Sequence, residues 1–111
     1  MALEVKVQDL AQTHAAITLV GDLDDAGGKA ARRQLARVVQ SGRLNLTVDL
    51  DRVGVLESAG LAALIATLRL ARDRGGSIRV QTSKPDFRRV MELTGLSRIF
   101  RVTPAGAQTA A

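Results

Sequence analysis

Hydrophobic and polar residues alternate along several short stretches of the chain. A period of two is typical of β-strands, whose successive side chains point to opposite faces of a sheet. The polar segment 9–13 separates the first two stretches, so we expect these to form an antiparallel pair at the sheet edge. The expected strands cover residues 3–7, 15–20, 46–55 and 78–80, and a short last strand is expected at 99–102.

Other stretches repeat apolar residues every three or four positions, which is typical of amphipathic helices. The clearest begins after Ser58, where leucine or isoleucine occupies positions 61, 64, 65 and 68 and Gly75-Gly76 supplies the end. The expected helices cover residues 28–40, 58–74 and 83–94. Helices that alternate with the later strands make those strands parallel. The sequence therefore predicts a single α/β domain with a mixed sheet.

Composition narrows the function. A chain of 111 residues with 46% hydrophobic residues fits one domain, expected at 1–102 with a tail at 103–111. It has no cysteine and one histidine, His14, which excludes disulfides and both thiolate and multi-histidine metal sites. No apolar run approaches the roughly 20 residues that span a bilayer, and the charged, alternating N-terminus is unlike a signal peptide. We expect a cytoplasmic protein without membrane insertion.

The net charge of +5 makes nucleic acid a partner to consider. The arginines are scattered over separate helical stretches, however, and Phe87 and Phe100 are the chain's two aromatic residues. Nucleic-acid binding needs a clustered basic patch and aromatic side chains for stacking on bases. The pattern therefore favours a solvated helix surface over direct nucleic-acid binding.

Acidic residues concentrate in two segments that the expected topology brings together. Parallel strands joined through a helix end at the same edge of a sheet, so segment 21–25 should meet segment 50–58. The basic residues lie mainly on the helices. The sequence therefore predicts an acidic edge around Ser58 on a basic protein. Six of the eleven acidic residues lie there: Asp22, Asp24, Asp25, Asp49, Asp51 and Glu57.

Ser58 is the candidate for chemistry at this edge. As a serine at a helix N-terminus it could simply be the N-cap, which is the commonest role of such residues. Serine hydrolysis is excluded because no base lies near in sequence and the nucleophile-elbow glycine is missing. A cation held by Asp24 and Glu57 has no support beyond charge, so no cofactor is expected. Gly27-Gly28-Lys29 lacks the spacing of a phosphate loop and is interpreted as a flexible helix entry.

Three stretches of the chain carry motifs that are specific in combination. The first is Gly21-Asp22-Leu23-Asp24, and the second runs from Val48-Asp49-Leu50 through Leu56-Glu57-Ser58-Ala59-Gly60-Leu61. The third is Met91-Glu92-Leu93-Thr94-Gly95-Leu96 followed by Ile99-Phe100. Together they resemble the STAS domain family of bacterial anti-sigma-factor antagonists. The first is similar to the family's glycine, acid, apolar, aspartate signature, the second to its strand followed by Asp-Ser-Ser/Thr-Gly-Leu, and the third to a typical family ending. The resemblance runs from about Leu3 to Val102.

The resemblance implies a role for each residue of the motif. Ser58 would accept a phosphate, Gly60 and Leu61 would shape and anchor the helix start, and Asp24 and Glu57 would assist phosphorylation or partner contact. The partner would be an anti-sigma factor of the ATPase-kinase type. The unphosphorylated domain would bind it, and phosphorylation of the serine would break the complex. The protein would therefore be a regulator rather than an enzyme.

Two departures from the family pattern keep alternatives open. Glu57 replaces the usual aspartate, and Ala59 replaces the usual second hydroxyl. A STAS docking or regulatory subunit of a transport or stress-sensing complex, without phosphorylation, is the main alternative. A small-ligand or nucleotide binder using the same edge is a further one. A second copy of the chain, in a weak homodimer, is a further candidate partner.

Overall fold

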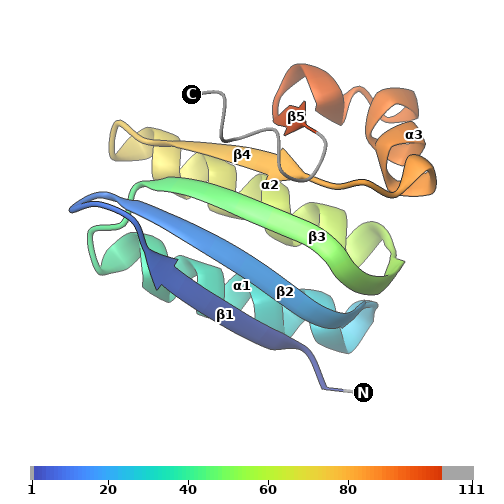
Figure 1. Ribbon diagram of the computed structural model, residues 1–111, viewed down its shortest axis with the longest axis horizontal. Coiled ribbons are helices and arrows are strands. Elements are labelled where there is room, and N and C mark those ends of the chain that lie inside the picture. The colour runs from blue at the N-terminus through green and yellow to red at the C-terminus, as the bar shows by residue number, and fades with distance from the viewer. Residues whose placement is uncertain (1, 104–111) are drawn as a thin grey trace.

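The computed structural model describes residues 2–103, which form one five-stranded sheet with helices packed on it (Figure 1). The strands lie in the order β1-β2-β3-β4-β5. β1 is antiparallel to β2, and every other neighbouring pair is parallel. The mixed α/β fold predicted from the sequence is confirmed. The strands are β1 Glu4–Asp9, β2 His14–Leu23, β3 Asn45–Leu56, β4 Ser77–Gln81 and β5 Arg101–Thr103.

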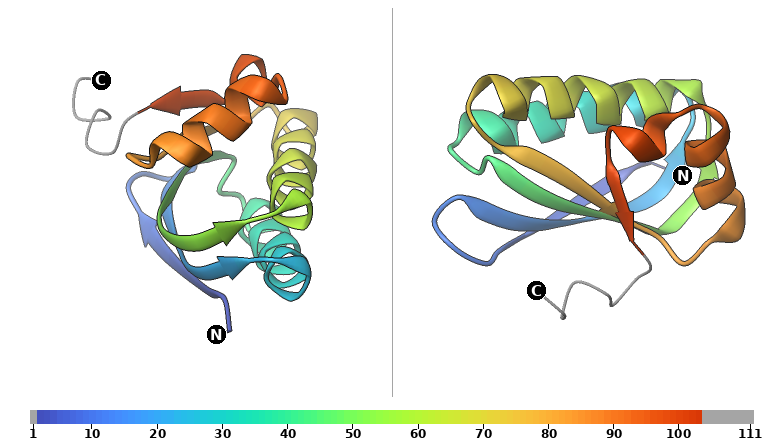
Figure 2. Two further views of the ribbon diagram at one scale, coloured as in Figure 1. Left: turned by 90° about the vertical axis from the view of Figure 1, so that its right-hand side faces the viewer. Right: turned by 90° about the horizontal axis from the view of Figure 1, so that it is seen from above.

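The helices leave one face of the sheet uncovered. α1 and α2 lie side by side on the same face, whereas α3 and the short 3-10 helix η1 lie beyond β4 and lead into β5 (Figure 2). Within residues 2–103, no helix has both the length and the apolar content that a membrane crossing requires. The helices are α1 Asp25–Gln40, α2 Ser58–Asp73, α3 Pro85–Leu93 and η1 Leu96–Arg98.

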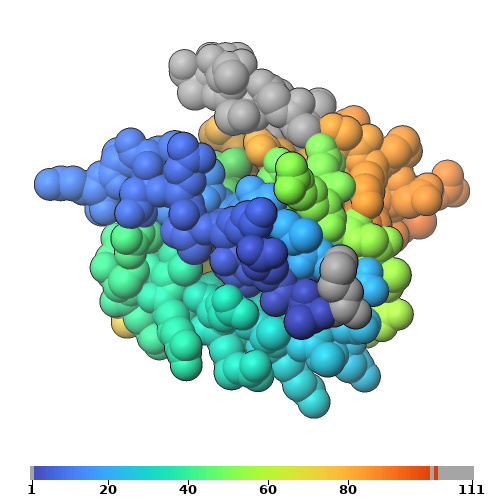
Figure 3. Space-filling view, turned by 60° about the horizontal axis from the view of Figure 1, so that its bottom comes forward, coloured from blue at the N-terminus to red at the C-terminus, as the bar shows by residue number. Residues whose placement is uncertain are grey.

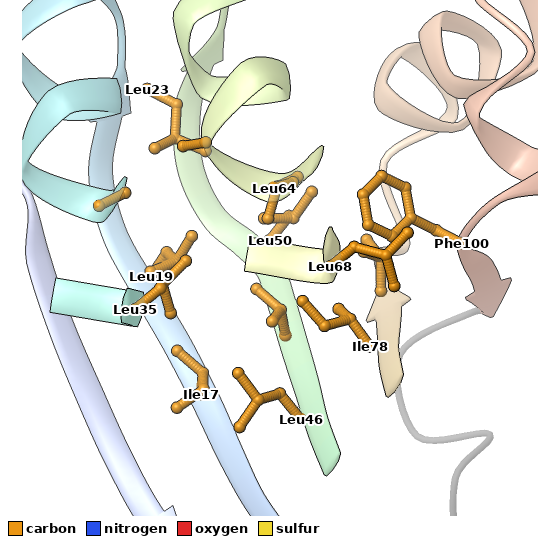
Figure 4. Packing of buried hydrophobic residues seen from close by; sticks show 14 of the residues in the cluster. Ile17, Leu19, Leu23, Leu35, Leu46, Leu50, Leu64, Leu68, Ile78 and Phe100 are labelled. Atoms are coloured by element: carbon orange, nitrogen blue, oxygen red, sulfur yellow. The ribbon is translucent and has the colours of Figure 1, made fainter. Parts of the chain in front are cut away.

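The core fills the space between the sheet and the helix pair (Figure 4). Alternate residues of β2 and β3 point into it and meet the apolar stripes of α1 and α2, because strand side chains alternate between faces. Asp49 and the other intervening residues of β3 point to the uncovered face. Buried core residues include Ile17, Leu19, Leu35, Leu46, Val48, Leu64 and Leu68.

β2 is longer than the sequence pattern predicted. It continues through Asp22 to Leu23, because Leu23 is fully buried and Asp22 takes the outward position between two buried neighbours. β3 matches its expected range to within one residue at each end, and it extends beyond its pairing with β4, which ends at Asp49. Irregular register between β2 and β3 after Thr18 accommodates this extension. The two long strands end together, with Leu23 paired to Leu56, and thereby set the position of the two helix starts.

The C-terminal part of the domain differs in detail from expectation. Ile99 does not begin a strand, because η1 and the following turn occupy 96–100 and β5 covers Arg101–Thr103. Phe100 is nevertheless 1% exposed and belongs to the core. The expected tail, 103–111, lies outside the described residues except for Thr103.

Candidate functional site

Ser58 is the first residue of α2, and its side chain is exposed. The N-cap position belongs to Glu57, which has an extended backbone and makes no capping hydrogen bond with its side chain. The prediction that Ser58 could serve as the N-cap is therefore wrong by one residue. Within residues 2–103, no group forms a hydrogen bond with the Ser58 hydroxyl, so this hydroxyl is available to react or to bind.

The main chain fixes the start of α2. The Glu57 N–H donates to the Leu23 carbonyl oxygen at 3.0 Å, which ties the helix entry to the end of β2. The Glu57 carbonyl in turn accepts from the N–H groups of Gly60 at 3.0 Å and Leu61 at 3.1 Å. Because the first N–H groups of a helix lack partners within it, the α2 terminus presents positive partial charge beside Ser58.

Gly60 and Leu61 hold this start against the sheet. Gly60 is buried, and a Cβ at its position would lie 2.6 Å from the Leu23 Cβ and 3.2 Å from a methyl group of Leu56. A larger residue would push the helix away from the end of the strands. Leu61 is half-buried and packs against the core. Both residues thus lie where the start of α2 meets the ends of the strands.

Ala59 contacts the first turn of α1 across a very short gap. A Cβ at Gly28 would lie 2.6 Å from the Ala59 carbonyl carbon and 2.8 Å from its Cβ. A Cβ at Gly27 would lie only 1.8 Å from the Asp22 carbonyl oxygen. Both glycines are buried in α1, so the interpretation of this segment as a flexible helix entry is wrong. The sequence alone gave no indication that Gly28 faces Ala59.

Asp24 caps α1 and stands at the same edge as Ser58. Its Oδ1 accepts a hydrogen bond from the Gly27 N–H at 2.8 Å. Asp24 directly follows Leu23, whose carbonyl holds Glu57, so the starts of both helices share one corner of the sheet. This geometry leaves Asp24 half-buried and Glu57 exposed. The two acidic residues flank the site from different helices.

Asp22 extends this edge on its sheet side. A Cβ at Gly54 would lie 2.8 Å from the Asp22 Oδ1, so the glycine gives the carboxylate room beside β3. Asp25 opens α1 and is exposed. The acidic edge predicted around Ser58 thus contains four of the six expected residues: Asp22, Asp24, Asp25 and Glu57.

Asp49 and Asp51 belong to a different part of the molecule. Both lie inside the long β3 strand, and Asp49 accepts hydrogen bonds from the Asp51 N–H at 2.8 Å and the Gln81 Nε2 at 3.2 Å. Asp51 accepts from the Ser83 N–H at 2.6 Å and the Ser83 hydroxyl at 3.0 Å. Their expected membership of the edge around Ser58 is wrong, because β3 runs on past them to Leu56.

The environment of Asp51 keeps its carboxylate charged. Burial raises the pKa of Asp51, but hydrogen bonds from the N–H and hydroxyl of Ser83 and from the Thr82 hydroxyl, together with the positive charge of Lys84, outweigh this effect. The pKa is therefore below its ordinary value. Lys84 also donates to the Val53 carbonyl. These contacts bind the β4–α3 connection to β3 and serve structure rather than the serine site.

No metal centre is built from the described part of the chain, where no three histidine, aspartate or glutamate side chains converge. The corner around Ser58 thus combines one free hydroxyl, a positive helix terminus and several carboxylates. Such a corner can carry a covalently attached phosphate and contact a partner.

Comparison with known proteins identifies the architecture. The family model described as "Mlab, STAS domain" matches residues 7–103. The chain belongs to the STAS domain family. The anti-sigma-B factor antagonist of Bacillus subtilis (strain 168) is a relative that is 23% identical over 87 residues, which is 78% of this chain and 79% of that protein.

Solved structures agree with this STAS assignment. An anti-sigma factor antagonist from Mycobacterium paratuberculosis superposes with a TM-score of 0.83 and 27% identity, over 96% of this chain and 90% of that one. The anti-sigma factor antagonist SpoIIAA in its unphosphorylated form superposes with a TM-score of 0.81 and 18% identity, over 96% of this chain and 92% of that one. The latter likeness concerns the fold alone. Several relatives and structural neighbours of this STAS domain carry the name anti-sigma factor antagonist.

Proposed function

We propose that this STAS domain is an anti-sigma factor antagonist whose binding to its partner is switched off by phosphorylation of Ser58. The partner would be an anti-sigma factor with an ATPase-type kinase fold, and the STAS domain would act in the cytoplasm by binding rather than by catalysis. The observation that carries the proposal is the exposed Ser58 hydroxyl, which opens α2 and has no hydrogen-bond partner among residues 2–103.

The helix terminus gives a phosphate on Ser58 a favourable position. A phosphoserine adds about −1.5 to −2 charges at pH 7, and first-turn N–H groups and the helix dipole stabilise negative charge at a helix start. The contacts that hold α2 are main-chain hydrogen bonds and the packing of Gly60 and Leu61, and none of them uses the serine oxygen. The fold should therefore tolerate the modification.

The acidic surroundings explain how the same phosphate would dissociate a partner. Asp24, Asp25 and Glu57 already present carboxylates at this corner. A partner that binds the unmodified corner must accept this charge, and a phosphate adds more negative charge at the centre of the contact. Asp24 and Glu57 would contribute to partner contact, and Ala59, Gly60 and Leu61 would hold the helix start in position. Binding would change without unfolding.

A kinase assay tests the proposal directly. The chain is incubated with ATP and each ATPase-fold anti-sigma factor encoded in the same genome, and phosphate is mapped by mass spectrometry of proteolytic peptides. We expect one phosphate on Ser58 and none on the Ser58→Ala variant. Ser97→Ala is the matched control, since it removes an exposed hydroxyl from η1 and should leave the phosphorylation unchanged.

Binding measurements complete the test. Calorimetry should detect binding of unmodified protein and of Ser58→Ala to the anti-sigma factor, and much weaker binding of the phosphorylated form. Binding of equal affinity before and after complete phosphorylation would refute the switch. Failure of every anti-sigma factor of the genome to bind would refute the antagonist function itself.

A docking subunit without phosphorylation is the second candidate, and the Ala59–Gly28 contact favours it. Where the family usually has a second hydroxyl, this chain has a methyl group pressed against the backbone of α1. Such packing at the start of α2 suits a subunit that binds a transport or stress-sensing complex with constant affinity, without any change by phosphorylation. In that case the protein copurifies with such a complex, and Ser58→Ala and Ser58→Glu retain full function in vivo.

A further inference from the structure

The outer edge of β1 is an unpaired strand edge. β1 forms its ladder with β2 on one side, and within residues 2–103 no strand pairs with its other side. In Figure 3 the dark blue β1 segment lies at the surface, and no other coloured segment covers it. An exposed strand edge carries free N–H and C=O groups that can pair with another strand.

The two faces of β1 differ in chemistry. Lys6 and Glu4 lie opposite Thr18 and Val20 of β2, on the uncovered face of the sheet. Val5 and Val7 lie opposite the buried residues Leu19 and Ile17, on the face that carries the helices. Val7 is nevertheless 45% exposed, because the apolar layer ends at this edge. Leu3 and Val5 pack against the rim of the same layer.

We propose that β1 pairs with β1 of a second copy of this chain, in antiparallel orientation and centred on Val5. In this register Val5 lies opposite its own counterpart, and Leu3 of each copy lies opposite Val7 of the other. Glu4 of each copy lies opposite Lys6 of the other, which gives two cross-strand pairs of opposite charge. The twofold arrangement continues one sheet through both copies and keeps all helices on one side.

Neighbouring twofold registers are disfavoured by charge. Centring on Lys6 would place two ammonium groups opposite each other, and centring on Glu4 would do the same for two carboxylates. Like charges directly opposite each other on a sheet are destabilising. The order glutamate, valine, lysine therefore selects the register centred on Val5. That register also joins the apolar layers of the two copies on the helix-covered face, because Leu3, Val5 and Val7 of both copies come together.

Charge reversal tests the pairing without changing the fold. Sedimentation equilibrium of the wild-type chain should give a concentration-dependent mass between 11.8 kDa and twice that value. Lys6→Glu and Glu4→Lys each turn both attractive pairs into repulsive ones, so we expect the dimer dissociation constant of each variant to rise at least about ten-fold. An equimolar mixture of the two variants should restore association, because their charges are complementary.

Matched controls exclude a general effect of charge. Arg88→Glu and Glu92→Lys make the same changes at exposed positions of α3, away from β1, and should associate like the wild type. Circular dichroism should give unchanged spectra for all variants. A wild-type chain that stays at the monomer mass at every concentration would overturn the proposal. So would single variants that associate as well as wild type, or a mixture that stays monomeric.

Discussion

Replacing Gly28 by alanine would put a methyl group where α1 meets the start of α2. The new Cβ would lie 2.6 Å from the Ala59 carbonyl carbon and 2.7 Å from its oxygen. Non-bonded heavy atoms rest at about 3.5–4.0 Å from one another, so one helix start must move by roughly 1 Å. The contact is with main-chain atoms, which cannot rotate away as a side chain can.

Two effects of opposite sign set the size of the change. Overpacking of a close contact costs about 1–3 kcal/mol, whereas alanine is favoured over glycine inside a helix by about 0.8–1.0 kcal/mol. The overpacking term exceeds the helix term over most of its range. We therefore expect Gly28→Ala to lower the free energy of unfolding by up to about 2 kcal/mol, which corresponds to a fall in Tm of up to about 10 °C for a domain of this size.

Urea and thermal denaturation measure this change. Ala62→Gly at an exposed position of α2 is the control, because it reports the helix preference in the same layer without a new contact. The double variant Gly28→Ala/Ala59→Gly should recover little stability, since the Ala59 main chain remains in place. If the close contact cost nothing, only the helix preference would remain, and Gly28→Ala would raise the Tm by as much as Ala62→Gly lowers it. That result would refute the reasoning.

Three further predictions concern Leu23, Asp24 and Asp51. Leu23→Ala should lower the free energy of unfolding by about 2–5 kcal/mol in urea titrations, because Leu23 is 0% exposed and lies beneath Gly60. A loss as small as that of an exposed residue, about 0.5 kcal/mol or less, would contradict this role. Asp24→Ala should cost about 0.5–2 kcal/mol through the lost cap, and Asp24→Asn should keep most of that stability while still changing partner affinity. Since the pKa of Asp51 is lowered in the folded state, its contribution to stability is present above the unfolded value of about 3.9 and is lost as the pH falls below it. Asp51→Asn should flatten this acid dependence in urea titrations between neutral and acidic pH, and an unchanged profile would count against the Ser83 and Thr82 contacts.

The sequence predicted those features that depend on local periodicity. The i, i+3, i+4, i+7 spacing of Leu61, Leu64, Ile65 and Leu68 placed α2 to within a residue at each end. The short loop between β1 and β2 correctly indicated their antiparallel pairing. These features follow from the alternation of side chains along strands and helices, which the sequence displays directly.

Features that depend on contacts between distant segments could not be predicted. Gly28 meets Ala59 across 31 positions of sequence, and no local pattern marks such a contact. Asp49 and Asp51 were assigned to the edge around Ser58, but their carboxylates accept hydrogen bonds from Gln81, Thr82 and Ser83. These partners lie 31 or 32 positions away in the sequence, so no local pattern marks the contacts.

The main-chain bonds that hold the start of α2 have a consequence for the evolution of the site. Main-chain hydrogen bonds to the Leu23 and Glu57 carbonyl oxygens hold the start of the helix. The exposed side chains of Glu57 and Ser58 take no part in these bonds. Changes at these two neighbouring codons should therefore alter the chemistry of the corner at little cost to folding.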